Sequence, residues 1–356
     1  MDSKAGARER FDAACDNLIA LSHRIHAHPE LGFEEERACA WLSELLADAG
    51  FAVETGIGGL PTAFVARAGS GPLHLAICAE YDCLPGIGHA CGHNIIAAMS
   101  AGAGIAAARV ADDVGLTISV IGTPAEEGGG GKILLLERGA FAGVHAAMMV
   151  HPTPTDVLEL PIIAATHFNV RYTGKEAHAS AFPERGINAA DALTVAQTAI
   201  GLLRQHIRPT DRIHGIITKG GDAPNVVPAH TAAQYIVRAQ TLDELGGIRA
   251  KVLRCFEAGA LATGAKLEVS GGEKPYAEMR HDPEIAAVYR RNAEALGRTF
   301  PDPTAALQRA AASTDMGNIS LALPSIHPAI GINSLPAGLA AGRKTCKRVL
   351  PRVAFV

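Results

Sequence analysis

The sequence lacks the features of secreted, membrane-spanning and nucleic-acid-binding proteins. Its first residues contain no apolar segment of the kind that forms the core of a secretory signal. The longest apolar stretch, residues 95–110, is too short and too rich in alanine and glycine for a membrane span, so we expect a buried helix. With a net charge of −4, the chain has no overall positive field that would attract nucleic acid or an anionic membrane.

The cysteines show no disulfide framework. They are seven, an odd number, and they are scattered from Cys15 to Cys346. Such usage is typical of a protein that works in a reducing compartment, so we expect a cytoplasmic location.

The pattern of apolar runs predicts an α/β fold. Strand-like runs at residues 73–79, 116–122 and 146–150 alternate with helix-like runs at 95–110 and 132–138. This β-α-β-α-β order indicates a mostly parallel sheet with helices on both faces. Two further helices are expected before it, over residues 8–25 and 34–49.

The pattern changes near residue 165, which indicates a second domain inserted into the first. The order of elements there is β-α-β-β-α-β, typical of a ferredoxin-like α+β domain. The expected elements are strands at 167–173, 212–219, 231–241 and 266–270, with helices at 188–204 and 245–263. We therefore predict three segments: 1–164, the inserted 165–280, and 281–356, which returns to the first domain.

Metal-ligating side chains follow three of the predicted strands. In open α/β sheets, ligands bind at the carboxyl ends of the strands, so these side chains should meet. A thiolate, imidazoles and carboxylates favour zinc, with manganese, cobalt or nickel as alternatives. The residues are Asp82, Cys91 and His93 after the first strand, Glu126 and Glu127 after the second, and His151 after the third.

Each of these groups alone has an ordinary structural explanation, such as a turn cysteine or a solvated helix start. Their placement after three successive strands makes coincidence a poor account. The adjacent glutamates also suggest a division of labour, in which one binds metal and the other accepts a proton from water. A nucleotide-binding α/β protein is a weaker alternative. It rests on the glycines at 128–131, without a GxGxxG fingerprint or a Walker lysine-serine pair.

Several strings resemble one known family closely. AEYDCLPGIGHACGHN, GTPAEEGGGGK, MMVHP and HRIHAHPELGFEE, with GKEAHASAFPERGINAADA, GGDAPNVVP and YIVRAQT, look like the aminoacylase/hippuricase superfamily of dinuclear metallopeptidases. The resemblance is to the branch of auxin-conjugate hydrolases, aminobenzoyl-glutamate hydrolase and Xaa-Arg dipeptidases, and covers about residues 15 to 332. It implies a metal-dependent amidohydrolase acting on a dipeptide or an N-acyl or N-aroyl amino acid.

The resemblance also implies roles for individual residues. Two divalent ions would be held by Cys91, His93, Glu127 and His151, with the Cys91 thiolate bridging them. Glu126 would be the general base, and Asp82 would support the site from behind the ligands. Residues 165–280 would be a lid that forms a homodimer. Its His178 would help to bind the amide oxyanion, and Asn225 and Arg238 would hold the substrate carboxylate.

The C-terminal segment departs from the family pattern. Family members usually carry a last metal-binding histidine soon after a strand like residues 327–332, and no histidine follows His327 here. The tail after residue 332 is basic and suggests a truncation or a frame shift, with a natural but divergent terminus as the alternative. The alternative to an active enzyme is therefore a metal-binding pseudoenzyme of the same family.

Overall fold

The computed structural model describes residues 3–300 and 312–332 and divides into two compact units. One unit comprises the chain up to Ile162 together with the chain from Met279 onward, and the other is Ile163–Glu278. The tail after residue 332, where the sequence departs from the family pattern, lies outside the described residues.

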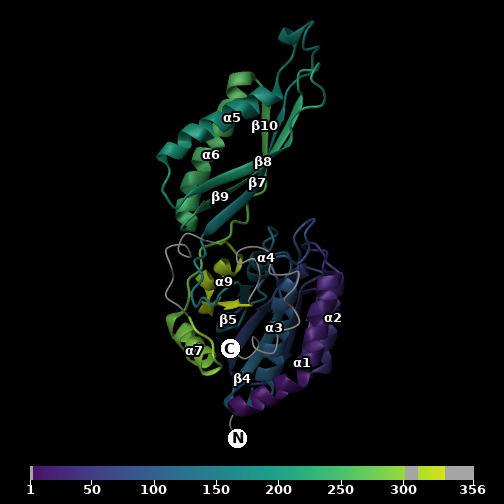
Figure 1. The fold of residues 1–356 in the computed structure, drawn as a ribbon, viewed down its shortest axis with the longest axis vertical. Helices are drawn as coiled ribbons and strands as arrows, with labels where there is room; N and C mark the ends of the chain where they lie inside the picture. Colours follow the sequence, from purple (N-terminus) through teal and green to yellow (C-terminus); the bar gives the residue numbers. More distant parts are fainter. Residues whose placement is uncertain (1–2, 301–311, 333–356) are drawn as a thin grey trace. The chain divides into compact units, whose positions relative to one another are not determined.

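The first unit is an α/β domain with a mixed sheet (Figure 1). Its described strands form a six-stranded sheet in the order β1-β2-β4-β3-β5-β11. β4, β3, β5 and β11 are parallel, and β2 pairs antiparallel with both β4 and β1. A separate pair joins β12 to β6. The elements are α1 (Ser3–Ala27), α2 (Glu36–Asp48), β1 (Ala52–Thr55), β2 (Phe64–Ala68), β3 (Leu73–Ala79), α3 (His93–Ala108), β4 (Leu116–Gly122), α4 (Gly131–Glu137), β5 (Ala146–Met148), β6 (His151–Thr153), α7 (Pro283–Ala295), α9 (Met316–Ala322), β11 (Ser325–Ile326) and β12 (Ala329–Gly331).

Helices cover both faces of this sheet, because its strands alternate between two apolar cores. Phe64 and Ala66 of β2 face the core formed with α1 and α2, whereas Val65 between them belongs to the other core. That second core includes Leu135 of α4 and Ile319 of α9. Met148 of β5 packs both with Ala103 and Ala107 of α3 and with the apolar cluster of α7, so α7 lies on the same face of the sheet as α1, α2 and α3.

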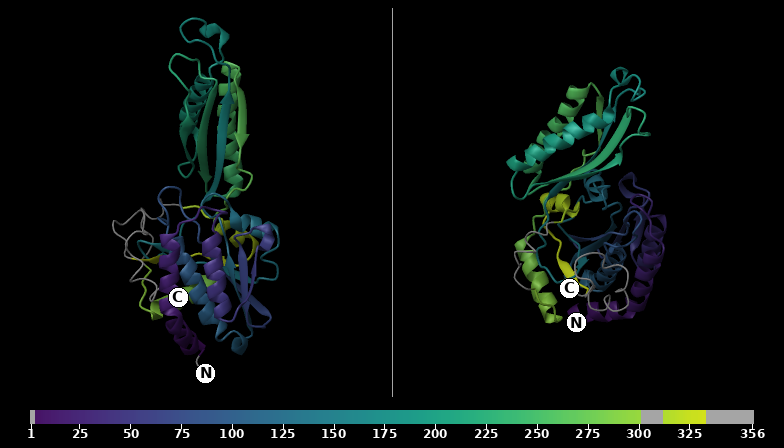
Figure 2. Two further views of the ribbon diagram at one scale, coloured as in Figure 1. Left: turned by 90° about the vertical axis from the view of Figure 1, so that its right-hand side faces the viewer. Right: turned by 45° about the horizontal axis from the view of Figure 1, so that its top comes forward.

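The second unit has the predicted β-α-β-β-α-β order. Its four antiparallel strands lie in the order β10-β7-β9-β8, and α5 and α6 pack against one face of the sheet (Figure 2). The elements are β7 (Ala164–Thr173), α5 (Ala189–Leu203), β8 (Arg212–Lys219), β9 (His230–Ala239), α6 (Leu242–Thr263) and β10 (Lys266–Ser270). The α/β fold with an α+β insertion is thus the fold that the sequence predicts.

The sheet continues beyond the predicted strands, because β2 pairs antiparallel with β4 and β1 pairs antiparallel with β2. No helix in the described parts of the chain combines the length and the apolar character needed to cross a bilayer.

Candidate active site

Three strand ends of the first unit bring the predicted chemistry together. Glu80 and Asp82 follow β3, the Glu126–Glu127 pair follows β4, and His151 begins β6 just after β5. The loop after β3 then returns Cys91 and His93 to the same place, where His93 is the first residue of α3. This is the carboxyl edge of the parallel part of the sheet, as the strand-end argument requires.

His93 is at the centre of the cluster. Its Nδ1 lies 2.8 Å from Asp82 Oδ1, and the ring is almost fully buried. Its Nε2 makes no hydrogen bond in the described part of the chain and lies 3.5 Å from Glu80 Oε2 and 3.9 Å from both Glu126 Oε2 and Glu127 Oε1. A carboxylate on one ring nitrogen and an unused second nitrogen form the arrangement of a metal-ligating histidine.

Two overlapping sets of donor atoms share His93. One set joins Cys91, His93 and His151, and the other joins His93, Glu126 and Glu127, with the donor atoms of each set within 4.8 Å of one another. Cys91 Sγ lies 3.5 Å from His151 Nε2. These sulfur, imidazole and carboxylate donors fit a site for zinc or a similar divalent ion.

The electrostatics of the cluster also favour a cation. Burial, with Glu80 and Asp315 nearby, raises the pKa of Glu126 well above its ordinary value, and burial likewise raises the pKa of Glu127. Burial raises the pKa of the Cys91 thiol to about 11. In the protein alone, burial therefore disfavours the ionised forms of these groups, and a bound cation would stabilise them.

Sequence reasoning missed a buried ion-pair network beside this cluster. Lys132, on α4, is fully buried, and its Nζ lies 2.5 Å from Glu80 Oε1 and 2.7 Å from Asp315 Oδ1. Asp315 Oδ2 also accepts a hydrogen bond from the Lys132 backbone N–H at 2.9 Å. Although burial opposes ionisation of Glu80, Lys132 lowers the pKa of that carboxyl to about 2. The signal in the sequence was a lysine at the start of the apolar run KILLL.

His327, just before β12, lies beside the cluster. Its ring is buried, contacts the His151 ring edge-on at a centroid distance of 5.9 Å, and has Nδ1 3.2 Å from the Met149 carbonyl oxygen. It does not belong to either of the two donor sets that share His93. Burial and the neighbouring His151 lower the pKa of His327 to about 3, so its ring is neutral at physiological pH.

The three candidate residues of the second unit fall into two places. The exposed loops that carry His178 and Asn225 lie side by side, because Ala179 N–H donates to the Asn225 carbonyl oxygen at 3.0 Å. Both loops adjoin the His230 end of β9, where Gly174 N–H donates to the Ala229 carbonyl oxygen.

Arg238 lies at the other end of β9. It is eight positions from His230, which at about 3.3 Å per position is about 26 Å. Within one copy of this unit, therefore, Arg238 does not meet His178 or Asn225.

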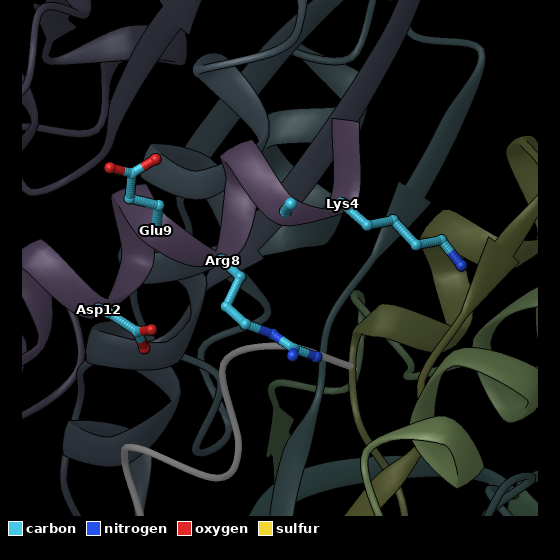
Figure 3. Close-up of a pocket in the computed structure, with 5 residues that line it drawn as sticks. Lys4, Arg8, Glu9 and Asp12 are labelled. Atoms are coloured by element: carbon cyan, nitrogen blue, oxygen red, sulfur yellow. The ribbon is translucent and has the colours of Figure 1, made fainter. Parts of the chain in front are cut away.

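Figure 3 shows a pocket elsewhere, on α1, which is lined by Lys4, Ala5, Arg8, Glu9 and Asp12. Its lining mixes both signs of charge and contains none of the predicted site residues. Lys4 Nζ donates a hydrogen bond to Asn292 Oδ1 of α7 at 2.7 Å. This pocket offers no chemistry related to the cluster around His93.

Comparison with known proteins identifies the family. The model of "Peptidase family M20/M25/M40" matches residues 76–344, about three quarters of the chain. The chain belongs to this peptidase family. It is 40% identical over 340 residues to Xaa-Arg dipeptidase from Mus musculus, an alignment that covers 91% of this chain and 79% of the relative.

A further relative and a solved structure are also similar to this chain. The M20/M25/M40 chain is 33% identical over 281 residues to one of the polypeptides of p-aminobenzoyl-glutamate hydrolase from Escherichia coli, covering 73% of this chain and 58% of the relative. A dinuclear metal-binding M20 peptidase from Bacillus subtilis has the same fold, with a TM-score of 0.69 at 21% identity, over 96% of this chain and 97% of that one.

Family membership confirms the resemblance seen in the sequence and the expectation of a hydrolase that acts on peptide or amide bonds. It gives no support to the pseudoenzyme or to the nucleotide-binding alternative.

Proposed function

We propose that this peptidase hydrolyses the amide bond of a dipeptide or of an N-acyl or N-aroyl amino acid that ends in a free carboxylate. The observation that carries the proposal is that the other three predicted ligands and the Glu126 carboxyl group lie around His93, although they come from three different strand ends. Burying several acidic groups together opposes folding. A cluster of this kind is therefore evidence of a functional site, such as a metal site.

Cys91, His93, Glu127 and His151 would hold the metal ions, and zinc suits this donor set best. When bound, the metal would polarise the amide carbonyl and activate water for attack. Asp82 holds the His93 ring in place through Nδ1 and fixes which nitrogen faces the other donors.

Glu126 is the proton carrier in this proposal. It is buried, and its Oε2 lies 3.9 Å from His93 Nε2. It would accept a proton from the attacking water and deliver it to the leaving amine nitrogen. Its raised pKa suits a group that must hold a proton for part of the cycle.

The named relatives support the choice of substrates. The names Xaa-Arg dipeptidase and p-aminobenzoyl-glutamate hydrolase both describe cleavage next to an amino acid that bears a free carboxylate. Arg238 would bind that carboxylate from the sheet face that α5 and α6 leave uncovered, where it lies near His167 and His214.

The second unit would act as a lid and as the contact between two copies of the chain. His178 would bind the amide oxyanion and Asn225 the substrate carboxylate. Their distance from Arg238 within one copy favours a site to which two copies contribute. The described cysteines are all free, which supports a reducing, cytoplasmic location.

A substrate panel with metal analysis tests the proposal. The purified chain, reconstituted with zinc, manganese, cobalt or nickel, is assayed on dipeptides ending in arginine, on p-aminobenzoyl-glutamate, and on the carboxamide of each. We expect hydrolysis of free acids over carboxamides and a divalent metal that copurifies. A chain that binds no divalent ion, or that hydrolyses no amide with any of the four metals, would contradict the proposal.

A further inference from the structure

The turn that carries Glu126 has an unusual backbone. Ala125, directly before Glu126, has φ +57°, in the left-handed region that an alanine side chain disfavours. In the described part of the chain, Phe33 at φ +67° is the other non-glycine residue with a positive φ. A strained backbone conformation persists only when the surrounding structure stabilises it. The contacts of Ala125 therefore show which residues fix the orientation of the adjacent Glu126 side chain.

A buried carboxyl group holds the turn from one side. Glu35 lies just before α2, is fully buried, and its Oε1 accepts a hydrogen bond from Ala125 N–H at 2.8 Å. The two residues are 90 positions apart in the sequence. Burying a carboxyl group opposes folding unless hydrogen bonds compensate for the lost hydration. The hydrogen bond from Ala125 N–H provides such compensation for Glu35.

The segment that carries Glu35 also packs closely against the turn. A Cβ atom at Gly32 would lie 2.9 Å from Ala125 Cβ, and one at Gly129 would lie 2.6 Å from Ala125 Cβ and 2.8 Å from the Phe33 ring. Only glycine fits at either position without displacing a neighbour. The two strained residues, Phe33 and Ala125, thus belong to segments that are in contact.

A second carboxylate holds the turn from its other side. Asp82 Oδ2 accepts a hydrogen bond from Glu127 N–H at 2.8 Å, while its Oδ1 lies 2.8 Å from His93 Nδ1. The peptide N–H groups on both sides of Glu126 are therefore held by acidic side chains, Glu35 before it and Asp82 after it.

We propose that Glu35 is a positioning residue, which fixes the left-handed turn at Ala125 and thereby aims the Glu126 and Glu127 carboxylates. The inference rests on the proposed function in assigning roles to Glu126 and Glu127. Glu35 itself touches the backbone of the turn and no reacting group.

Three substitutions test this role. Glu35→Leu keeps a side chain of similar size but removes the acceptor. Glu35→Asp withdraws the carboxyl group by one methylene, and Glu35→Gln is the control that still offers an oxygen to Ala125 N–H. We expect Glu35→Leu to lower kcat by about tenfold or more with KM within about threefold, because chemistry depends on the aim of Glu126. Glu35→Gln should remain within about threefold of wild type in both constants.

A readout independent of catalysis separates this inference from the proposed function. Hydrogen exchange at the Ala125 amide should be at least about tenfold faster in Glu35→Leu than in wild type, and nearly unchanged in Glu35→Gln. If wild type hydrolyses no amide, the proposed function fails, and the exchange result still decides the positioning of the turn.

The inference is overturned if Glu35→Leu leaves kcat and Ala125 exchange within about twofold of wild type, or if Glu35→Gln loses as much as Glu35→Leu. If Glu35→Leu does not fold, Glu35→Asp takes its place, and unchanged exchange at Ala125 in that variant overturns the inference equally.

Discussion

Replacing Lys132 with methionine should destabilise the first unit strongly. The side chain is fully buried, and its ammonium lies between the Glu80 and Asp315 carboxylates at 2.5 and 2.7 Å. Methionine fills nearly the same volume but leaves both carboxyl groups without their cation. Breaking a buried ion pair by removing one partner costs about 3–5 kcal/mol, and we expect a loss in this range.

Urea unfolding, followed by the fluorescence of Trp41, measures this loss. Trp41 is the single tryptophan of the sequence and lies in α2, so the signal reports on the first unit. The matched control is Lys4→Met, at an exposed lysine of the same unit, for which we expect a change within about 0.5 kcal/mol.

A combined variant tests the electrostatic cause. Adding Glu80→Gln and Asp315→Asn to Lys132→Met removes the buried charges together, and should restore at least about half of the lost stability. A cost below about 1 kcal/mol for Lys132→Met would refute the reasoning. So would a combined variant less stable than the single one, because the penalty would then not come from unpaired carboxylates.

Three further predictions concern the site and its surroundings. Glu126→Gln should lower kcat by about 10²–10⁴-fold while the metal content, measured by elemental analysis, stays at the wild-type level; a near wild-type rate would remove Glu126 as the proton carrier. Arg238→Ala should raise KM for free-acid substrates by roughly tenfold or more but not for their carboxamides, since a hydrogen bond to a charged group contributes about 1.5–3 kcal/mol. The control is Arg212→Ala, because Arg212 lies directly opposite Arg238 on β8. If Arg238→Ala raised KM equally for acid and amide substrates, Arg238 would not be the residue that binds the carboxylate. Burial raises the pKa of Glu35 to about 7 from its ordinary 4.5, so its contribution to stability is present below pH 4.5 and is lost as the pH rises to 7. The unfolding free energy of wild type relative to Glu35→Gln should therefore fall across that window by up to about 3 kcal/mol, and a difference independent of pH would contradict the raised pKa.

The sequence by itself determined the family and most elements of the fold, although not β1 and β2. The apolar runs at Leu73–Ala79 and Leu116–Gly122 form β3 and β4 with the predicted bounds, and the inserted unit has the predicted order of strands and helices. These features depend on local periodicity, which a single sequence displays directly. The rule that ligands gather at the carboxyl ends of strands also brought Cys91, His93, Glu127 and His151 into one expected site, and their donor atoms lie together in the structure.

Only the tertiary structure decided which distant residues support that site. Lys132 pairs with Asp315 across 183 positions, and Glu35 reaches Ala125 across 90, and no periodic pattern connects such residues. It likewise placed Arg238 at the opposite end of β9 from His178 and Asn225, because strand register and sheet order set that separation. Local sequence encodes the period of each element, whereas these contacts depend on how the packed elements bring buried charges and backbone groups within hydrogen-bond distance.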